Sequence, residues 1–235
     1  MHIDPAHLAP PDRYKLLIGG IVPRPIALVS TITTGKTFVT VADAAHVNIA
    51  PFSFFAGVGS NPMTLLFCPA NTAEGGEKDS LRNAKPVSEG GQGEFVVNIA
   101  PARIVRQLAA CAEPLPYGES EAALSGLTPI ASSVVGPPRV SECGVAFECR
   151  TQQVIRTQAG ASSAGNIVIG LVVAVHVDDA LINDRLHIDP ELLDAVARMG
   201  GMTYCSTRER FDLPAGRGAL EKAQPIPAEP QRGTQ

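Results

Sequence analysis

Two stretches of the sequence, residues 23–55 and 78–83, concentrate side chains that can bind an anionic ligand. Arg24, Lys78 and Ser80 are cationic or hydroxyl donors of the kind that a phosphate group requires. Arg24 also lies between two prolines, and their restricted backbone would aim its guanidinium at a fixed target. Lys78 and Ser80 have a plainer interpretation as well, because a charged segment of this kind is typical of the start of a helix.

Several motifs resemble well-known sites but lack an essential residue. Residues 35–37 read Gly-Lys-Thr like the end of a P-loop, yet Ser30 stands where the first glycine is required. Residues 57–59 begin like a dinucleotide-binding fingerprint, but Pro62 occupies the position of the third glycine. The histidines are isolated, and no Gly-x-Ser-x-Gly elbow is present. The sequence therefore predicts no P-loop, Rossmann unit, metal site or serine nucleophile, and we assign no catalytic residue.

The composition of the 235 residues is that of a folded chain, with 45% hydrophobic and 18% charged residues. The net charge is -4 and no segment is rich in Lys and Arg, which argues against nucleic acid as a partner. The longest apolar stretch, residues 167–175, is far shorter than the ~20 residues that a membrane span needs, and no signal-peptide pattern precedes it. We therefore expect a cytoplasmic protein with no membrane partner and with buried, reduced cysteines.

Hydrophobic patterning predicts a mostly β fold. Residues 26–32 and 37–41 are β-branched runs joined by a short polar segment, which predicts a hairpin. The side chains of residues 147–155 alternate, which predicts a strand whose wetter face carries Glu148 and the two polar residues Arg150 and Gln152. Further strands are predicted at residues 63–68, 94–99, 145–157 and 166–177.

Helical spacing is confined to short segments. An apolar run between Asp12 and Gly19-Gly20 predicts a helix that the aspartate caps and the glycines end. Two sets of apolar residues recur at i, i+4 and i+7, and each predicts one amphipathic helix on the sheet. These sets are Ile104, Leu108 and Cys111, and Leu192, Val196 and Met199. Because strands dominate without regular strand–helix alternation, an antiparallel barrel with peripheral helices is favoured over a doubly wound parallel sheet.

A series of short motifs follows one order along the chain. Arg-Pro-Ile-Ala-x-Val-Ser-Thr stands at residues 24–31, Asn-x-Ala-Pro-Phe-Ser-Phe-Phe at 48–55, and Lys-Asp-Ser at 78–80. Later motifs stand at residues 115–118, 126–129, 137–140 and 200–204. In this order the motifs resemble the flavin reductase-like proteins with the FMN-binding split barrel. The resemblance extends from residue 12 to residue 213.

The resemblance implies a Greek-key antiparallel split β-barrel that pairs into a homodimer, with one flavin near each subunit boundary. It places the flavin-binding domain at residues 1–213. Residues 214–235 are rich in proline and glycine, and we expect this tail to be disordered or to lie over a partner subunit. The segment 42–46 is longer than in the family pattern, which leaves open whether His46 lines the flavin site.

The resemblance and the residue types together predict the flavin site. A flavin needs flat apolar walls, which Pro51, Phe52 and Phe54 can provide, and donors and acceptors at its polar edge. The full set of predicted flavin-binding residues is Arg24, Ser30, Thr31, Asn48, Ala50, Pro51, Phe52, Ser53, Phe54, Lys78, Ser80 and Asn83. The phenylalanines have an equally good interpretation as residues of the barrel core.

The chemistry implied by the resemblance is reduction of FMN, or of FAD, by NADH or NADPH. The protein would bind and orient the reactants, and the reduced flavin would leave for a flavin-dependent monooxygenase or pass electrons to a bound acceptor. Alternatives are a tightly bound FMN that acts on a small organic substrate, a non-enzymatic flavin carrier, and a barrel without flavin. Without a Rossmann unit the sequence does not distinguish NADH from NADPH.

Overall fold

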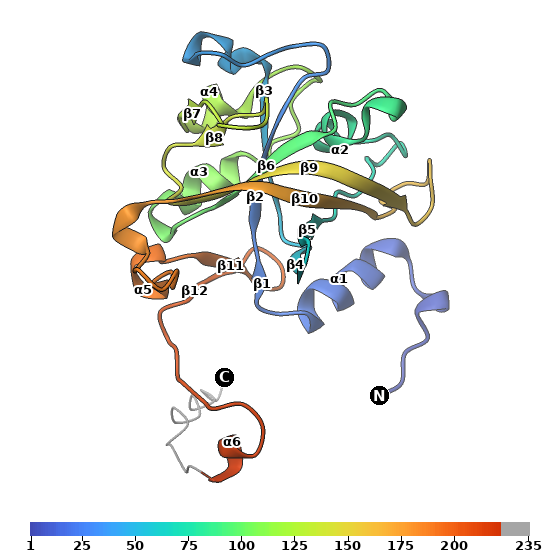
Figure 1. Ribbon diagram of the computed structural model, residues 1–235. Coiled ribbons are helices and arrows are strands. Elements are labelled where there is room, and N and C mark those ends of the chain that lie inside the picture. The colour runs from blue at the N-terminus through green and yellow to red at the C-terminus, as the bar shows by residue number, and fades with distance from the viewer. Residues whose placement is uncertain (222–235) are drawn as a thin grey trace.

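One antiparallel sheet dominates the computed structural model, which describes residues 1–221 (Figure 1). Its seven strands lie in the order β3-β2-β6-β9-β10-β5-β4. Their bounds are β2 (Ala27–Ile32), β3 (Val47–Phe52), β4 (Phe55–Ser60), β5 (Met63–Phe67), β6 (Glu94–Ile99), β9 (Val145–Arg156) and β10 (Asn166–Val177). The predicted mostly β, antiparallel fold is confirmed, as are the strands predicted at residues 63–68, 94–99, 145–157 and 166–177.

The large sheet is curled, so that its two ends approach each other at one corner. Strands β3 and β4 lie at opposite ends of the strand order, yet only Ser53 and Phe54 connect them. Because this connection spans roughly 11 Å at most, the two edges must meet where β3 ends and β4 begins. Within residues 1–221 no ladder joins β3 to β4, so the sheet is not closed.

Two small sheets and short helices complete the fold. The small sheets are formed by β1 (Arg24–Pro25), β11 (Val196–Arg198) and β12 (Tyr204–Ser206), and by β7 (Pro129–Ile130) and β8 (Arg139–Val140). The α-helices are α1 (Pro10–Gly20), α2 (Asp79–Ala84), α3 (Val105–Ala110), α4 (Glu121–Ser125), α5 (Pro190–Leu193) and α6 (Gly218–Glu221). The 3-10 helices are η1 (Pro5–His7), η2 (Val41–His46), η3 (Val87–Glu89), η4 (Ala102–Ile104) and η5 (Asp179–Leu181). In the part of the chain that the structure describes, no helix combines the length and the hydropathy that crossing a membrane requires.

Helices pack on both faces of β2, and all of its residues are buried. Leu28 and Ile32 belong to a core cluster that includes residues of α3 and α4. Ala27 and Val29 belong to the cluster on the other face, which includes residues of α2. This alternation is the period of two that a strand imposes, and it gives the two faces of the sheet separate cores.

The predicted hairpin of residues 26–32 and 37–41 is wrong, because β2 pairs with β3 and β6 instead. Thr40 and Asp43 form a capping box that starts the 3-10 helix η2, and both the Val39 and Thr40 N–H groups donate to Asp43 Oδ2 at 2.9 Å. These local hydrogen bonds turn the β-branched run into a helix start. The extra segment 42–46 is therefore this helix, and His46 does not line the cavity described below.

The predicted helix containing Leu192, Val196 and Met199 is also wrong. Helix α5 ends at Leu193, because Asp194 adopts a left-handed conformation with φ of 44°. The chain then continues as β11, in which Val196 is buried, whereas Leu192 is exposed. The other helical set is confirmed, since Ile104, Leu108 and Cys111 are all buried around α3.

Two smaller predictions need correction. The first helix is present as α1, but it begins at Pro10 and its N-cap residue is Ala9, so Asp12 lies in its first turn and does not cap it. On β9, Arg150 and Gln152 are exposed as predicted, but Glu148 is wholly buried beneath the connection between β7 and β8. The alternating pattern therefore identified the strand but not the loop that covers part of its polar face.

Candidate functional site

A cavity of ≈ 370 Å³ lies along β3, which is an edge strand of the large sheet. Its lining comes from β3, from the segment 72–82 that contains the start of α2, and from the connection 111–117 between α3 and α4. Glu121, the first residue of α4, completes it. Among the described strands β3 pairs only with β2, so no strand covers its outer edge.

A buried network of amide and hydroxyl side chains forms the floor of this cavity. Asn48 Nδ2 donates to Ser80 Oγ at 2.9 Å and to Thr31 Oγ1 at 3.2 Å. Asn83 Nδ2 also donates to Thr31 Oγ1, at 3.1 Å. The β2–β3 register sets Thr31 opposite Asn48, and the helical spacing of α2 puts Ser80 and Asn83 on one buried face. The network therefore joins two strands and a helix at one point.

The walls of the cavity combine apolar side chains with cations. Pro51 and Phe52 of β3 and Leu115 of the α3–α4 connection supply apolar surface. Lys78 and Arg82 are exposed and also line the cavity. These two cations give the entrance a positive character suited to an anionic group.

Tyr117 links the wall to the floor of the cavity. Its ring centroid lies 4.9 Å from the Arg82 guanidinium, within the range of a cation–π contact. Its hydroxyl donates to Asn83 Oδ1 at 3.2 Å. The α3–α4 connection is therefore held to α2 through one aromatic side chain.

Glu77, one of the acidic residues in the lining, has its charge compensated. It accepts hydrogen bonds from Lys85 Nζ and Arg156 Nη2, each at 2.8 Å. Burial raises the pKa of Glu77, but these two cations outweigh the burial and hold the pKa below its ordinary value. Glu77 is thus ionised, and the two cations of the protein compensate its negative charge.

Glu121 has a different environment from Glu77. Its side chain is 5% exposed, and its Oε2 accepts a hydrogen bond from the Ile49 N–H of β3 at 2.8 Å. Within residues 1–221 no cation pairs with it. Burial, assisted by the negative charge of Asp79, outweighs the Ile49 hydrogen bond and raises the pKa of Glu121 to about 7. The cavity therefore contains a carboxyl group that titrates near neutral pH.

The structure brings together most of the residues predicted to bind flavin. Asn48, Ala50, Pro51, Phe52, Lys78 and Ser80 line the cavity. Thr31 and Asn83 lie behind this lining and hold Asn48 through the floor network. Four predicted residues lie elsewhere: Arg24, Ser30, Ser53 and Phe54 do not line the cavity.

Arg24 is 3% exposed, and its donors are engaged by the protein itself. Nη1 donates to the carbonyl oxygens of Ile18 at 2.6 Å and Ile21 at 2.7 Å, and Nη2 donates to that of Met199 at 2.8 Å. Its Nε donates to Ser53 Oγ at 3.2 Å, and its guanidinium lies 5.8 Å from the Phe54 ring centroid. The fixed target of Arg24 is therefore the end of α1 and the turn after β11, rather than a ligand in the cavity.

Ser30 faces the side of the sheet opposite to Thr31. Its Oγ donates to the Pro138 carbonyl at 2.5 Å and accepts from Asn98 Nδ2 at 3.1 Å. Neighbouring residues of a strand point to opposite faces, so Ser30 and Thr31 could not both reach one ligand across β2.

Sequence reasoning missed Arg82, Tyr117 and Glu121 as cavity residues. Signals existed for Arg82 and Tyr117, because Arg82 stands within the block 78–83 and Tyr117 within the motif 115–118. Glu121 carried no such signal. It follows a serine that caps a five-residue helix, and a glutamate in that position is common at helix starts.

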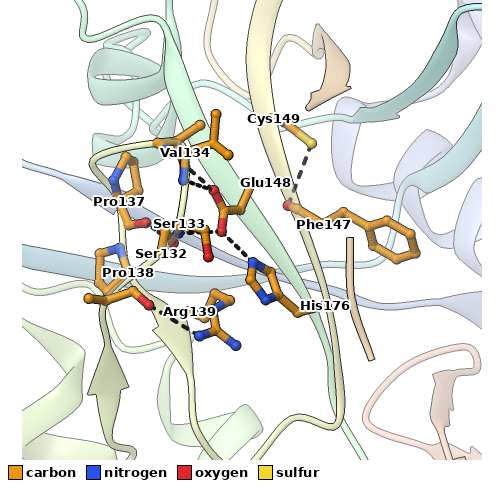
Figure 2. A network of polar contacts seen from close by, with 12 residues as sticks. Ser132, Ser133, Val134, Pro137, Pro138, Arg139, Phe147, Glu148, Cys149 and His176 are labelled. Atoms are coloured by element: carbon orange, nitrogen blue, oxygen red, sulfur yellow. Dashed lines mark hydrogen bonds and ion pairs between the residues drawn. The ribbon is translucent and has the colours of Figure 1, made fainter. Parts of the chain in front are cut away.

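A second buried polar network lies away from the cavity, around Glu148 of β9 (Figure 2). Its carboxylate accepts the N–H groups of Ser133 and Val134, each at 2.7 Å, and of Val135 at 3.0 Å. His176 of β10 places its Nε2 2.5 Å from Glu148 Oε1. Burial alone would raise the pKa of Glu148, but the N–H groups and His176 outweigh it and lower the pKa. This carboxylate fixes the β7–β8 connection to the sheet.

The cavity along β3 suits a cofactor that has a flat ring and a phosphate. Its volume lies in the range of ~300–1,000 Å³ that is usual for cofactor sites. The hydroxyl of Ser80 and the cations Lys78 and Arg82 are donors for a phosphate, and Pro51 and Phe52 offer apolar surface for a ring. The fold and the cavity thus define a mostly β protein whose cavity has the residue types that an aromatic, phosphate-bearing ligand would contact.

Comparison with known proteins identifies the family to which the chain belongs. The model of the flavin reductase like domain matches residues 22–198. A protein of Halalkalibacterium halodurans is 35% identical over 214 residues, covering 91% of this chain and 95% of that protein. The chain belongs to the flavin reductase-like family. Membership indicates a flavin cofactor and a flavin-related redox function.

Two solved structures of similar proteins agree with this assignment. Nitrilotriacetate monooxygenase component B from Bacillus cereus is 34% identical with a TM-score of 0.80, and the match covers 91% of this chain and 98% of that one. The 2-nitrobenzoate 2-nitroreductase of Pseudomonas fluorescens is 26% identical with a TM-score of 0.76, covering 97% and 100%. Both similarities extend over almost the whole fold.

Proposed function

We propose that this protein binds FMN in the cavity along β3 and reduces it with NADH or NADPH. The observation that carries the proposal is the floor network, in which Asn48 and Ser80 are held in place by buried partners next to Lys78. Of the predicted site residues, we retain Thr31, Asn48, Ala50, Pro51, Phe52, Lys78, Ser80 and Asn83. FAD would need further room for its second nucleotide, so FMN is the better match to a cavity of ≈ 370 Å³.

In this proposal the chain contributes binding and orientation rather than acid–base catalysis. Ser80, Lys78 and Arg82 hold the phosphate, and Pro51 and Phe52 border the ring and limit access of water. Bound FMN supplies hydride and electron transfer, which no side chain of the protein provides. We further propose that a flavin-dependent monooxygenase receives the reduced flavin. The similarity to a protein described as a monooxygenase component B supports this role.

We also propose that the protein works as a homodimer and that its curled sheet is the Greek-key split barrel of the family. Helix α1 has no buried residues, and Tyr14, Leu16 and Leu17 on it are about half exposed. Phe54, which directly precedes β4, places its ring centroid 6.5 Å from that of Tyr14 on α1. Strand β4 is an edge strand whose residues after Phe55 are exposed. A second copy is the partner that would cover this apolar surface. Size-exclusion chromatography with light scattering should give twice the mass of 24.6 kDa.

A second candidate function is reduction of a small organic substrate by tightly bound FMN. The similarity to a protein described as a nitroreductase favours it specifically. The two candidates differ in how firmly the flavin is held. FMN that stays with the protein through gel filtration supports the second candidate, whereas loss of most of the FMN supports supply of reduced flavin.

The test of FMN binding uses two serine variants that differ in their relation to the cavity. Ser80→Ala should weaken FMN binding by about tenfold, because it removes a buried donor to the phosphate. Ser53→Ala is the matched control, since Ser53 contacts Arg24 outside the cavity and should bind FMN like the natural protein. Flavin fluorescence titration measures both. Equal affinities for the two variants would place the flavin elsewhere.

The test of reduction is stopped-flow mixing of the FMN-loaded protein with NADH and with NADPH. Loss of the ~450 nm flavin absorbance with either nucleotide is the expected result. Absence of bleaching with both would leave a flavin-binding protein without reductase activity, such as a flavin carrier. The nucleotide that reduces the flavin at the higher rate is the preferred hydride donor.

A further inference from the structure

We infer that Glu121 is a proton-coupled residue of the ligand cavity, so that binding of a phosphate-bearing flavin is accompanied by uptake of a proton at its carboxyl group. This inference rests on the proposed binding of FMN in that cavity and goes beyond it, because it assigns the site a dependence on pH. Glu121 is a positioning residue, since its observed contact is with the backbone of β3.

Glu121 lies beside both strand β3 and the cavity. Its Oε2 accepts the Ile49 N–H, and Ile49 is flanked by Asn48 and Ala50, which line the cavity. Glu121 itself belongs to the same lining, although its side chain is only 5% exposed. The carboxyl group is thus buried against β3 at the border of the space that the ligand would fill.

The charged groups around this carboxyl group come from several elements. Elements α2, α3, η2 and the α3–α4 connection lie next to α4, β3 or the shared cavity. Their titratable or charged groups are Glu77, Lys78, Asp79 and Arg82 at or just before α2, Arg106 and Cys111 at α3, Asp43 and His46 on η2, and Glu113, Tyr117 and Glu119 in the connection. Asp79 disfavours the ionised form of Glu121. Lys78 and Arg82 are exposed and, among residues 1–221, neither forms an ion pair with Glu121.

A bound anion would change the pKa of Glu121. A phosphate in the same cavity adds negative charge near a buried carboxyl group that already has little compensation. The pKa of Glu121, raised to about 7 by burial, must then rise further when the ligand binds. Between pH 7 and 9 the free protein loses this proton, whereas the complex keeps it, so affinity falls as pH rises.

The experiment measures binding of FMN and of riboflavin to the full-length protein between pH 7 and pH 9. In this range the phosphate keeps its charge, because the second pKa of a phosphate ester lies near 6. FMN should bind about tenfold or more weakly at pH 9 than at pH 7. Riboflavin, which has no phosphate, should lose much less affinity. Calorimetry of FMN binding at pH 7.5 or so, in buffers of different ionisation enthalpy, should show net proton uptake.

Two variants identify the group that takes up the proton. Glu121→Gln keeps an acceptor for the Ile49 N–H and should flatten the pH dependence of FMN affinity. Asp79→Asn is the matched control and should keep most of the pH dependence, because Glu121 is intact. If the pH dependence of FMN affinity persists in Glu121→Gln and disappears in Asp79→Asn, the inference is overturned, because Asp79 would then be the group that takes up the proton.

The wild-type measurements keep the inference testable even where Glu121→Gln does not fold. FMN affinity that is equal at pH 7 and pH 9 with no proton uptake would overturn it, although the proposed function would stand. No FMN binding at pH 7 would instead overturn the proposed function itself. The two failures are therefore distinguishable in one set of titrations.

Discussion

Glu121 and Glu148 are both buried glutamates, yet the protein treats their charges in opposite ways. Glu148 is 0% exposed and accepts three backbone N–H groups besides contacting His176, and its pKa is lowered. Glu121 is 5% exposed and accepts one N–H group from another residue, and its pKa is raised to about 7. Burial raises the pKa of both groups, but three N–H groups and His176 outweigh it at Glu148, whereas Glu121 has a single such donor from another residue and the negative charge of Asp79 nearby.

The difference between the two carboxyl groups follows their positions in the fold. Glu148 lies where a loop must be attached to the sheet, and an ionised carboxylate that satisfies three N–H groups does this. Glu121 borders a cavity, and a group with few donors can change its proton when the cavity is filled. The first glutamate serves structure, and we propose that the second serves binding.

The largest expected effect is that of Glu148→Ala on stability. Removing this wholly buried carboxylate leaves the N–H groups of residues 133–135 without their acceptor and His176 without its partner, and we expect a loss of about 3–5 kcal/mol in the free energy of unfolding. Urea denaturation followed by circular dichroism measures it. Glu142→Ala is the control, because Glu142 accepts only the Thr128 N–H at an exposed site and should cost about 1 kcal/mol. Similar losses in both variants would show that Glu148 has no special role.

Above neutral pH, Glu121→Gln should raise the free energy of unfolding, whereas Glu148→Ala should lower it. The pKa of Glu121 is raised from 4.5 in the unfolded chain to about 7 in the fold. The contribution of this carboxyl group to folding stability is therefore most favourable below pH 4.5 and is lost as pH rises to 7. At pH 8 this loss amounts to about 3 kcal/mol, which the neutral glutamine avoids.

The measurement for Glu121→Gln is the thermal midpoint of the ligand-free protein at pH 5 and at pH 8. The variant should be more stable than the natural protein at pH 8 and similar to it at pH 5. Lower stability of the variant at pH 8 would mean that the ionised carboxylate is favoured in the fold, which contradicts the raised pKa. The lowered pKa of Glu148 acts in the reverse sense, since its contribution is lost as pH falls below about 4.5.

Thr31→Val should have an intermediate effect on stability, and it tests the contribution of the floor network to FMN binding. The Thr31 hydroxyl accepts from both Asn48 and Asn83, so its loss leaves two buried amides with one acceptor fewer. We expect a loss of about 1–3 kcal/mol in unfolding free energy and weaker FMN binding. Thr157→Val, at an exposed site, is the control for the substitution. Unchanged FMN affinity in Thr31→Val would show that the network does not position the cavity residues.

The sequence predicted the strands well because their pattern is local. Residues 94–99 and 166–177 were bounded correctly from their β-branched content, and the neighbours of each strand were not needed for this. The partner of β2 was wrong, because the capping box of Thr40 and Asp43 competes with a strand at residues 37–41. Pairing over a longer separation then replaced the expected hairpin.

The candidate site was predictable only in part. Through a family resemblance, the motifs at residues 48–55 and 78–80 identified the part of the lining that β3 and the start of α2 provide. The same resemblance and the residue types also included Ser30 and Arg24, which lie elsewhere. The period of two in a strand is sufficient to separate Ser30 from Thr31. The engagement of Arg24 by three carbonyl groups and the burial of Glu121 depend on tertiary packing, which no local pattern contains.

The smallest expected effect, that of His176→Gln, tests which donors lower the pKa of Glu148. Glutamine can still donate to Glu148 Oε1, and the three N–H groups remain, so the loss in unfolding free energy should stay below about 1 kcal/mol. Acid unfolding should move to a slightly higher pH, because one of the groups that lowers the Glu148 pKa is weakened. A loss as large as that of Glu148→Ala would show that His176, rather than the backbone of residues 133–135, keeps this glutamate ionised.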